Sequence, residues 1–570
     1  MHSIQAQAAL ADQHGLFRAA SALDVTSSLL NCSRCLPVNS LRKVANADIF
    51  LSHSWSCASW KKALAVCHHL NLDLAIASSL VVAALSATFI LFLLQAGDAD
   101  QRFIPQPEDV LFVWLFCLPM ATFLIVYLFG HVFSKTGIWF DQVCVEQDQP
   151  SVKAQTLQAV PAFVAQSAQM LVLWDETYCQ RLWCNYELAV RAKTGPTHAM
   201  VLVPIWKPLW TLSWFGIGFL LSCMVIGYKP PPFELDSRRA LFISMFELES
   251  LPAYMYVASG VPFSWFCLEK LRRHRWMLDE MASFDLKNAR CSVESDRQII
   301  EEHISDLFDE ALDPPLSVAF DADESRPPPL MDEMSLWHTL RTNIQQPSSE
   351  VDEMQDAAVP LVQTIRDIRH VTSYPTRAEV IDEFNTYVRG TLRDSVVIAL
   401  GQENEMSFKM CMVAVLPFIF MSLLSVLGCD GHRDCRVAAS DMGFSSVPAY
   451  LVSDVALNLL LAPLNLATNV PLALRCNQLV TRCAAEHGFL QLLLGSILTG
   501  TALWMSDCFL IGTAGTLLVI IEKYSPIWLA AFLACLFIQL AAVCLLFCKI
   551  TLPRPNLACC RSIVVTPGSA

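Results

Sequence analysis

The residues best suited to chemistry lie in one short segment, Arg181–Leu188, with the sequence RLWCNYEL. Its carboxylate, Glu187, lies four residues after Trp183 and three before Val190, so these side chains share one face of a helix. If that face packs inward, burial raises the pKa of the carboxyl, and a carboxylate in such a place can stabilise a developing positive charge. Trp183 and Tyr186 would supply surfaces on which a ring can stack.

A purely structural interpretation explains the same residues. Glu187 would pair with Arg191 four residues later, as carboxylates on helices commonly do, while Trp183 and Cys184 would fill a core. The spacing shows no glycine-rich phosphate loop and no second carboxylate that would act with Glu187. A lone CxxC at Cys32–Cys35, without a second pair or a histidine at ligand spacing, does not make a metal site, and we predict none.

The elements around this segment predict an α/β unit. Two short apolar runs, Met170–Leu173 and Ala199–Ile205, alternate with two helix-like patterns, which is typical of parallel strands joined by helices. A further buried strand, Ile49–Leu51, ends in a polar turn. Ligands of open α/β sheets bind beyond the carboxyl ends of the strands. We therefore expect three residues of this turn to line the site: Ser52, His53 and Trp55.

The composition predicts a membrane protein. Of the 570 residues, 54% are hydrophobic and only 16% are charged, and the mean hydropathy is +0.43. The net charge of −14 argues against nucleic acid as a partner, because phosphate binding needs a concentrated basic surface. The 22 cysteines are scattered along the chain, so most are expected to be reduced thiols. We expect no cleaved signal peptide at the N-terminus.

Eight apolar segments are long enough to cross a bilayer. We therefore expect a lipid bilayer to be the main partner of this chain. The basic cluster Lys270–Arg275 follows the fourth segment and places that side in the cytosol by the positive-inside rule. Both termini and the stretches 134–208 and 276–408 are then cytosolic, in a membrane that the sequence does not specify. Cys429 and Cys435 lie on the other side, where a disulfide and free thiols are both compatible with the sequence. The eight segments are 74–94, 110–133, 209–228, 240–268, 410–428, 447–474, 489–511 and 527–548.

These segments divide the chain into soluble and membrane parts. Two amphipathic patterns, 295–312 and 377–393, predict packing helices in the second soluble stretch. The predicted parts are a polar N-terminal segment (1–47), a first strand and helix (48–71), a transmembrane hairpin (72–133), an α/β core (134–208), a transmembrane pair (209–268), an acidic helical region (269–408), four spans (409–549) and a C-terminal tail (550–570).

The soluble pieces resemble Toll/interleukin-1 receptor (TIR) domains. Asp48–Ser52 resembles the first strand and first motif of that family, and Gly137–Trp206 resembles most of its remaining core. The most specific part is Tyr178–Leu188, which is similar to the Ser-x-Trp-Cys-x-x-Glu-Leu segment of plant-type TIR domains. The resemblance covers about a sixth of the chain. It implies a parallel, flavodoxin-like sheet with further strands at 138–140, 170–174 and 199–205 and helices at 151–169 and 178–193.

The chain departs from the family in one respect, because two membrane spans within 74–133 separate the first helix from the second strand. Two crossings return the chain to the side it left, so both halves can complete one sheet in the cytosol. The fifth strand and last helix of the family are not found before the third span. We expect them at Ser283–Ala289 and Ser295–Leu312.

The resemblance implies two functions for this domain. In TIR domains that cleave the bond between nicotinamide and ribose, the catalytic glutamate occupies the place of Glu187, which implies NAD+ as a substrate and no bound cofactor. Many TIR modules only assemble, which implies signalling by self-association. The loop Asp141–Pro150 would then supply contacts through Asp141, Glu146 and Asp148, unless it is simply solvated.

The membrane spans suggest a different function. Asp454, Asn458, Asn465 and Asn469 recur at intervals of four and seven, and Asp507 lies in the next span. Ionisable groups are costly in a bilayer and often line a transport path, so a channel or transporter with a regulatory TIR-like domain is the alternative. We favour the competing interpretation, in which the asparagines hydrogen-bond between helices.

Overall fold

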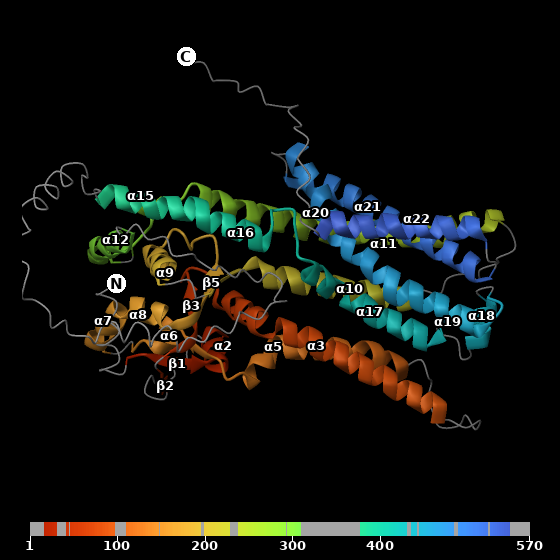
Figure 1. Ribbon diagram of the computed structural model, residues 1–570, viewed down its shortest axis with the longest axis horizontal. Coiled ribbons are helices and arrows are strands. Elements are labelled where there is room, and N and C mark those ends of the chain that lie inside the picture. Colours follow the sequence, from red (N-terminus) through yellow and green to blue (C-terminus); the bar gives the residue numbers. More distant parts are fainter. Residues whose placement is uncertain are drawn as a thin grey trace, which may run out of the picture.

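The computed structural model describes residues 16–30, 41–44, 46–96, 110–146, 149–194, 199–227, 238–291, 293–308, 377–429, 435–441, 444–483, 488–522 and 525–547. Figure 1 shows two parts, a small sheet with flanking helices at one end and a set of long helices that extends away from it. We call the first part the α/β unit (described residues of 16–58, 134–205, 276–308 and 377–400) and the second the bundle. Each part has its own buried apolar core.

The sheet of the α/β unit is mixed, with the strand order β2-β1-β4-β3-β5-β6. The strands from β3 to β6 pair in parallel, whereas β1 pairs antiparallel with both of its neighbours. The strands are β1 (Arg18–Ser21), β2 (Arg42–Lys43), β3 (Ala47–His53), β4 (Gly137–Trp139), β5 (Ser167–Trp174) and β6 (Ala199–Pro204).

β3 lies between β4 and β5 in the sheet, although a pair of long helices separates β3 from both strands in the sequence. Ile49 pairs with Ile138 of β4, and Phe50 pairs with Met170 of β5. The segments before and after the predicted hairpin therefore meet in one sheet. Phe50 and Leu171 are fully buried, as expected of parallel strands covered on both faces, which is why these strands are continuous apolar runs in the sequence.

The N-terminal segment contributes more structure than we predicted for residues 1–47. β1 adds to the sheet beside β4, and α2 (Ala22–Leu30) begins directly after it. The Ser21 hydroxyl donates to Asp24 Oδ2 at 2.7 Å and accepts from the Asp24 backbone N–H, which caps the start of α2. A strand of four residues is too short to show an alternating pattern, so the sequence did not reveal it. Cys32–Cys35 lies outside the described residues.

The segment between β4 and β5 holds three short helices, where we predicted a loop and one helix at 151–169. α6 (Asp141–Cys144) begins the predicted loop, and α7 (Pro150–Gln158) and α8 (Val160–Ala165) divide the predicted helix. The division lies next to Pro161, which has no backbone N–H to continue the hydrogen-bond ladder. The last three residues predicted as helix belong to β5.

The fifth strand expected at Ser283–Ala289 is not formed, so this prediction was wrong. The segment contains a 3-10 turn, η4 (Leu286–Asn288), and an aspartate before the turn accepts a backbone hydrogen bond that stabilises it. The chain then runs beside the start of α9 (Leu182–Lys193), where Arg290 forms an isolated parallel bridge with Arg181. The sheet in the described part of the chain ends at β6.

Both predicted amphipathic helices are present in the second soluble stretch. α12 (Glu294–Phe308) packs against α9 and against α15 (Arg377–Tyr387). α15 continues through the π-helical turn η5 (Val388–Leu392) into α16 (Arg393–Leu400). The apolar faces of these helices are buried in the core of the α/β unit, including Ile304 and Phe384.

Seven helical segments of the described chain are long and apolar enough to cross a membrane. They coincide with seven of the eight predicted spans. The eighth prediction, 240–268, lies within α11 (Arg238–Ala282), which is not among the seven. The seven are formed by α3 (Ser59–Ala96), η2 with α5 and η3 (Phe112–Cys117, Leu118–Phe129 and Gly130–Phe133), α10 (Trp206–Gly227), α17 (Phe408–Leu427), α19 with η7 and α20 (Val447–Val455, Ala456–Leu461 and Ala462–Cys483), α21 (Gly488–Glu522) and α22 (Pro526–Phe547).

Two helices, α3 and α11, continue without a break from one part of the molecule into the other. In α3, Val66 belongs to the core of the α/β unit and Ala75 belongs to the core of the bundle. In α11, Cys267 belongs to the bundle core and Met281 to the core of the unit. The first predicted span is thus continuous with the helix predicted before it.

The basic cluster Lys270–Arg275 holds the turn between α16 and α17. Lys270 is buried and its ammonium group donates to the backbone carbonyls of Glu403 and Glu405. The Arg275 guanidinium binds the Glu403 carboxylate through two hydrogen bonds of 2.6 and 2.9 Å. Lys270 and Arg275, two of the basic residues that indicated the cytosolic side, therefore also bind α11 to the turn between the two parts of the molecule.

Cys429 and Cys435 form a disulfide at the start of α18 (Cys435–Asp441). Figure 1 places α18 at the end of the bundle far from the sheet. The disulfide and the α/β unit thus lie at opposite ends of the long helices.

Candidate active site at the carboxyl edge of the sheet

Glu187 of α9 contacts the end of β3 through one hydroxyl group. The Ser52 Oγ donates to the Glu187 carboxylate at 2.5 Å and also lies 2.6 Å from the Tyr178 hydroxyl. Because the single hydrogen of Ser52 goes to Glu187, Tyr178 is the donor in the second contact. The three side chains form a short chain of hydrogen bonds from the core to the carboxyl edge of the sheet.

The carboxyl of Glu187 titrates near neutral pH. Burial raises its pKa from the ordinary value of 4.5 to about 8, and the negative charge of Asp141 acts in the same direction. The hydrogen bond from Ser52 and the positive charge of Arg181 oppose this shift without cancelling it. Glu187 itself is half-buried. A carboxyl with a raised pKa that still reaches the surface is typical of functional sites.

Arg191, the predicted ion-pair partner of Glu187, is used elsewhere. Its fully buried guanidinium donates at 3.0 Å to the backbone carbonyls of Val164, Ser167 and Ala168. These bonds fasten α9 to the end of α8 and the start of β5. The opposite charge that acts on the Glu187 pKa comes from Arg181.

His53, Trp55 and Asp141 form a second group at the same edge. The half-exposed Trp55 donates its indole N–H to Asp141 Oδ2 at 3.0 Å, and His53 Nε2 lies 3.9 Å from Asp141 Oδ1. Burial lowers the pKa of His53 to about 4, so its ring is neutral at physiological pH. Asp141, which we predicted in an exposed interface loop, therefore lies at the candidate site.

The rest of the predicted interface loop is less exposed than we expected. Val143, Cys144 and Val145 are buried, and Glu146 is partly exposed. Asp148 lies outside the described residues.

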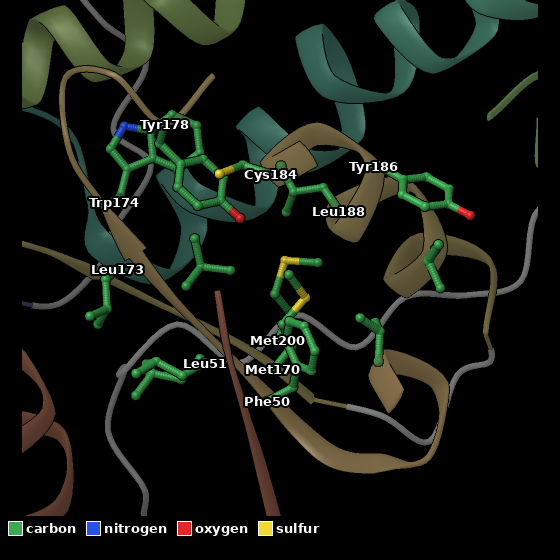
Figure 2. Close-up of a cluster of buried hydrophobic side chains, with 14 of the residues drawn as sticks. Phe50, Leu51, Met170, Leu173, Trp174, Tyr178, Cys184, Tyr186, Leu188 and Met200 are labelled. Carbon is green, nitrogen blue, oxygen red and sulfur yellow. The ribbon is translucent and has the colours of Figure 1, made fainter. Parts of the chain in front are cut away.

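Tyr186 does not belong to the candidate site. Its side chain is buried, and its hydroxyl lies 2.8 Å from Nδ1 of His303 on α12. Figure 2 shows the hydroxyl of Tyr186 pointing away from Tyr178. Adjacent residues of a helix differ by about 100° in direction, so Tyr186 and Glu187 face different neighbours. Trp183 is partly exposed and lies edge-on to Tyr186, with ring centroids 6.1 Å apart.

Three hydroxyl groups at the same edge of the sheet were not assigned to the site by the sequence analysis. The Thr177 Oγ1 donates to Asp175 Oδ1 at 3.0 Å and lies 2.6 Å from Ser54 Oγ and 2.5 Å from Ser56 Oγ. Asp175 and Thr177 follow β5 as Ser54 and Ser56 follow β3. The carboxyl ends of adjacent parallel strands lie side by side, which is the signal that would have found them.

A shallow cavity of about 230 Å³ opens at this edge. It is lined by Ser56, Thr177, Gln180, Arg181, Arg290 and Cys291. Glu187 does not line this cavity, so the carboxylate and the cavity are separate features of the same edge. No group of histidine, cysteine and acidic side chains in the described residues is arranged to hold a metal ion.

The predicted polar residues of the spans lie in the bundle, apart from this site. The Asn458 amide donates to the Asp454 carboxylate within one helix. The Asn465 amide of α20 donates to Asp507 of α21 at 3.1 Å and to the Ser506 carbonyl at 3.3 Å. The contacts of Asn465 connect α20 to α21.

Comparison of the chain with family models, with curated proteins and with solved structures found no match.

Proposed function

We propose that this chain is a multi-pass membrane protein that carries a TIR-like domain, the α/β unit, on the cytosolic side. Seven long apolar helices support the membrane assignment. The basic cluster at the unit's end of α11 supports a cytosolic unit. The Cys429–Cys435 disulfide at the opposite end agrees with an oxidising compartment there.

The function that the geometry supports best is hydrolysis of NAD+ at the bond between nicotinamide and ribose. The observation that carries it is the contact of Ser52 with Glu187 at the carboxyl edge of the sheet. In this reaction the bond between ribose C1′ and the nicotinamide nitrogen breaks, and its electron pair stays with nicotinamide. The oxygen of a water molecule bonds to C1′, and one proton is released with ADP-ribose.

Glu187 has the properties that this reaction requires. The transition state is an oxocarbenium-like cation, which a nearby carboxylate stabilises electrostatically. The nicotinamide ring of NAD+ is positively charged, so its arrival lowers the pKa of Glu187 from about 8 and favours the ionised form. Ser52 then holds the carboxylate in place, and Tyr178 fixes Ser52. The exposed ring of Trp55 offers a stacking surface at the same edge.

The test is nicotinamide release by the full-length protein in lipid nanodiscs supplied with NAD+. We expect Glu187→Gln to lower kcat by about 100-fold or more, the usual effect of removing one electrostatic stabiliser. Glu383→Gln, an equal change of charge on the exposed face of α15, is the matched control and should retain activity. Equal activity of wild type and Glu187→Gln, or no release by wild type, would overturn the proposal.

Signalling by self-association stays a prediction. Of the three acidic residues expected to make contacts, Asp141 is engaged by Trp55. Transport by the bundle is less well supported, because Asn465 and Asp507 link two helices.

A further inference from the structure

The cavity at the carboxyl edge of the sheet is formed by three segments that are distant in sequence. Ser56 follows β3, Thr177 follows β5, and Arg290 comes from the chain after α11. The residue that connects the cavity to the carboxylate is Arg181, which lines the cavity and also lowers the pKa of Glu187 by its charge. A ligand in the cavity and the candidate catalytic group would therefore both interact with Arg181.

Arg290 is placed in the cavity wall by its own backbone. Its N–H donates to the Gln180 carbonyl at 2.6 Å, and its carbonyl accepts from the Leu182 N–H at 3.0 Å. The result is a parallel bridge that sets Arg290 directly opposite Arg181. Two arginine residues thus line one small cavity, and their positive charges favour an anionic ligand there. Paired arginines with planar, forked donors are suited to phosphate oxygens.

The hydroxyl groups of the cavity include one that can donate to a ligand. Ser54, Ser56 and Thr177 lie within 2.7 Å of one another in three contacts, and Thr177 makes a fourth contact with Asp175. Three hydroxyls carry only three hydrogens, so one of the four contacts has none. Ser56 is exposed, so its hydroxyl hydrogen can point into the cavity. The hydrogens of Ser54 and Thr177 then serve the Ser54–Thr177 and Thr177–Asp175 contacts.

Two of the acidic side chains near the cavity add little negative charge at neutral pH. Burial raises the pKa of Glu280 to about 8, as it does for Glu187, so both carboxyls are largely protonated at pH 7. Asp175 accepts hydrogen bonds from the backbone and the side chain of Thr177. Arginine side chains stay charged at any physiological pH.

We propose that this cavity binds the phosphate groups of the dinucleotide substrate through Arg290, Arg181 and Ser56. The inference rests on the proposed function, because it takes the ligand of the cavity to be part of the molecule cleaved beside Glu187. It assigns substrate binding to Arg290, a residue that lies outside the segments resembling a TIR domain. The volume of about 230 Å³ suits a pyrophosphate group better than a whole dinucleotide.

The test is binding of inorganic pyrophosphate, ADP-ribose and adenosine to the full-length protein in nanodiscs, measured by calorimetry. We expect the two phosphate compounds to bind and adenosine to bind at least tenfold more weakly. Arg290→Gln should weaken pyrophosphate binding by about tenfold or more, the loss of one charge-assisted contact. Lys287→Gln, the same charge change at an exposed position three residues away, is the matched control and should leave binding unchanged.

A second variant keeps the test decisive if Arg290→Gln does not fold. Ser56→Ala removes only an exposed hydroxyl and should weaken pyrophosphate binding several-fold. Pyrophosphate binding that is absent, or equal in all four proteins, would overturn the proposal. Binding is measured without turnover, so a protein that binds pyrophosphate but releases no nicotinamide contradicts the proposed hydrolysis and leaves the phosphate site standing. For an active protein, Arg290→Gln should raise KM for NAD+ and leave kcat unchanged.

Discussion

The α/β unit and the bundle each contain a carboxylate away from bulk water, and the two are held differently. Glu187 of the unit accepts a hydrogen bond from the Ser52 hydroxyl and remains half-buried. Asp507 of the bundle is only 8% exposed and accepts from the amide of Asn465 on the neighbouring helix. The first arrangement holds a carboxylate at the edge of the sheet, whereas the second connects two helices.

The buried donors of the two parts differ in the same way. In the unit, Arg191 places a full charge among three backbone carbonyls. In the bundle, Asn465 links α20 to α21 through a neutral amide. A buried charge that loses its partners is very costly, while polar contacts within a bilayer contribute little on average because the alternatives also find partners. The polar groups of the unit should therefore be far more sensitive to substitution.

The largest effect is expected for Arg191→Met. The variant leaves three carbonyls without their charged donor, so we expect the free energy of local opening around α9 and β5 to fall by about 3 kcal/mol or more. Hydrogen exchange of the amides of both elements measures this quantity. Asn465→Ala is the comparison in the bundle, where the same measurement on α20 and α21 should fall by about 1 kcal/mol or less. Equal losses in the two variants would contradict the distinction between unit and bundle.

A smaller, pH-dependent effect is expected for Glu187→Gln. The carboxyl titrates at about 8 in the folded protein against an ordinary value of 4.5, so between these values the folded state holds a proton that the unfolded state has released. The stability contributed by this group therefore falls as pH rises from 4.5 to 8. The glutamine variant should match wild type near pH 4.5 and become more stable by a few kcal/mol above pH 8.

Thermal unfolding at several pH values between 4.5 and 9 measures this difference. The exposed Glu383→Gln serves as the control, for which the difference from wild type should not change with pH. A constant difference for Glu187→Gln would mean that the carboxyl has an ordinary pKa and that the site is more open than its contact with Ser52 indicates.

The parts of the fold that the sequence predicted are those with strong local patterns. The buried runs of β3, β5 and β6 and the long apolar helices were visible, because covered parallel strands and membrane spans both give continuous apolar segments. β1 was not visible, because four residues carry no period. The fifth strand expected at Ser283–Ala289 rested on the family resemblance alone, and the segment forms a turn instead.

The sequence could predict the candidate site only where residues close together in the sequence form it. Glu187 was found from its place on a helix, but Tyr186 was assigned to the same site although it is rotated by about 100° along that helix. Thr177 looked like any polar residue after a strand. The role of Arg290 could not be predicted, because its position depends on a backbone bridge to Arg181, more than a hundred residues away in the sequence.

The smallest effect is expected for Asp507→Asn in the bundle. Asparagine keeps the side-chain oxygen that accepts from Asn465, so the link between α20 and α21 persists and the stability should change by about 0.5 kcal/mol or less. The same variant tests the alternative function. If Asp507 only connects helices, any ion flux in reconstituted vesicles should be the same for wild type and variant. A flux that disappears in Asp507→Asn, while hydrogen exchange of both helices is unchanged, would assign the carboxylate to a transport path and remove the distinction between the two parts of the molecule.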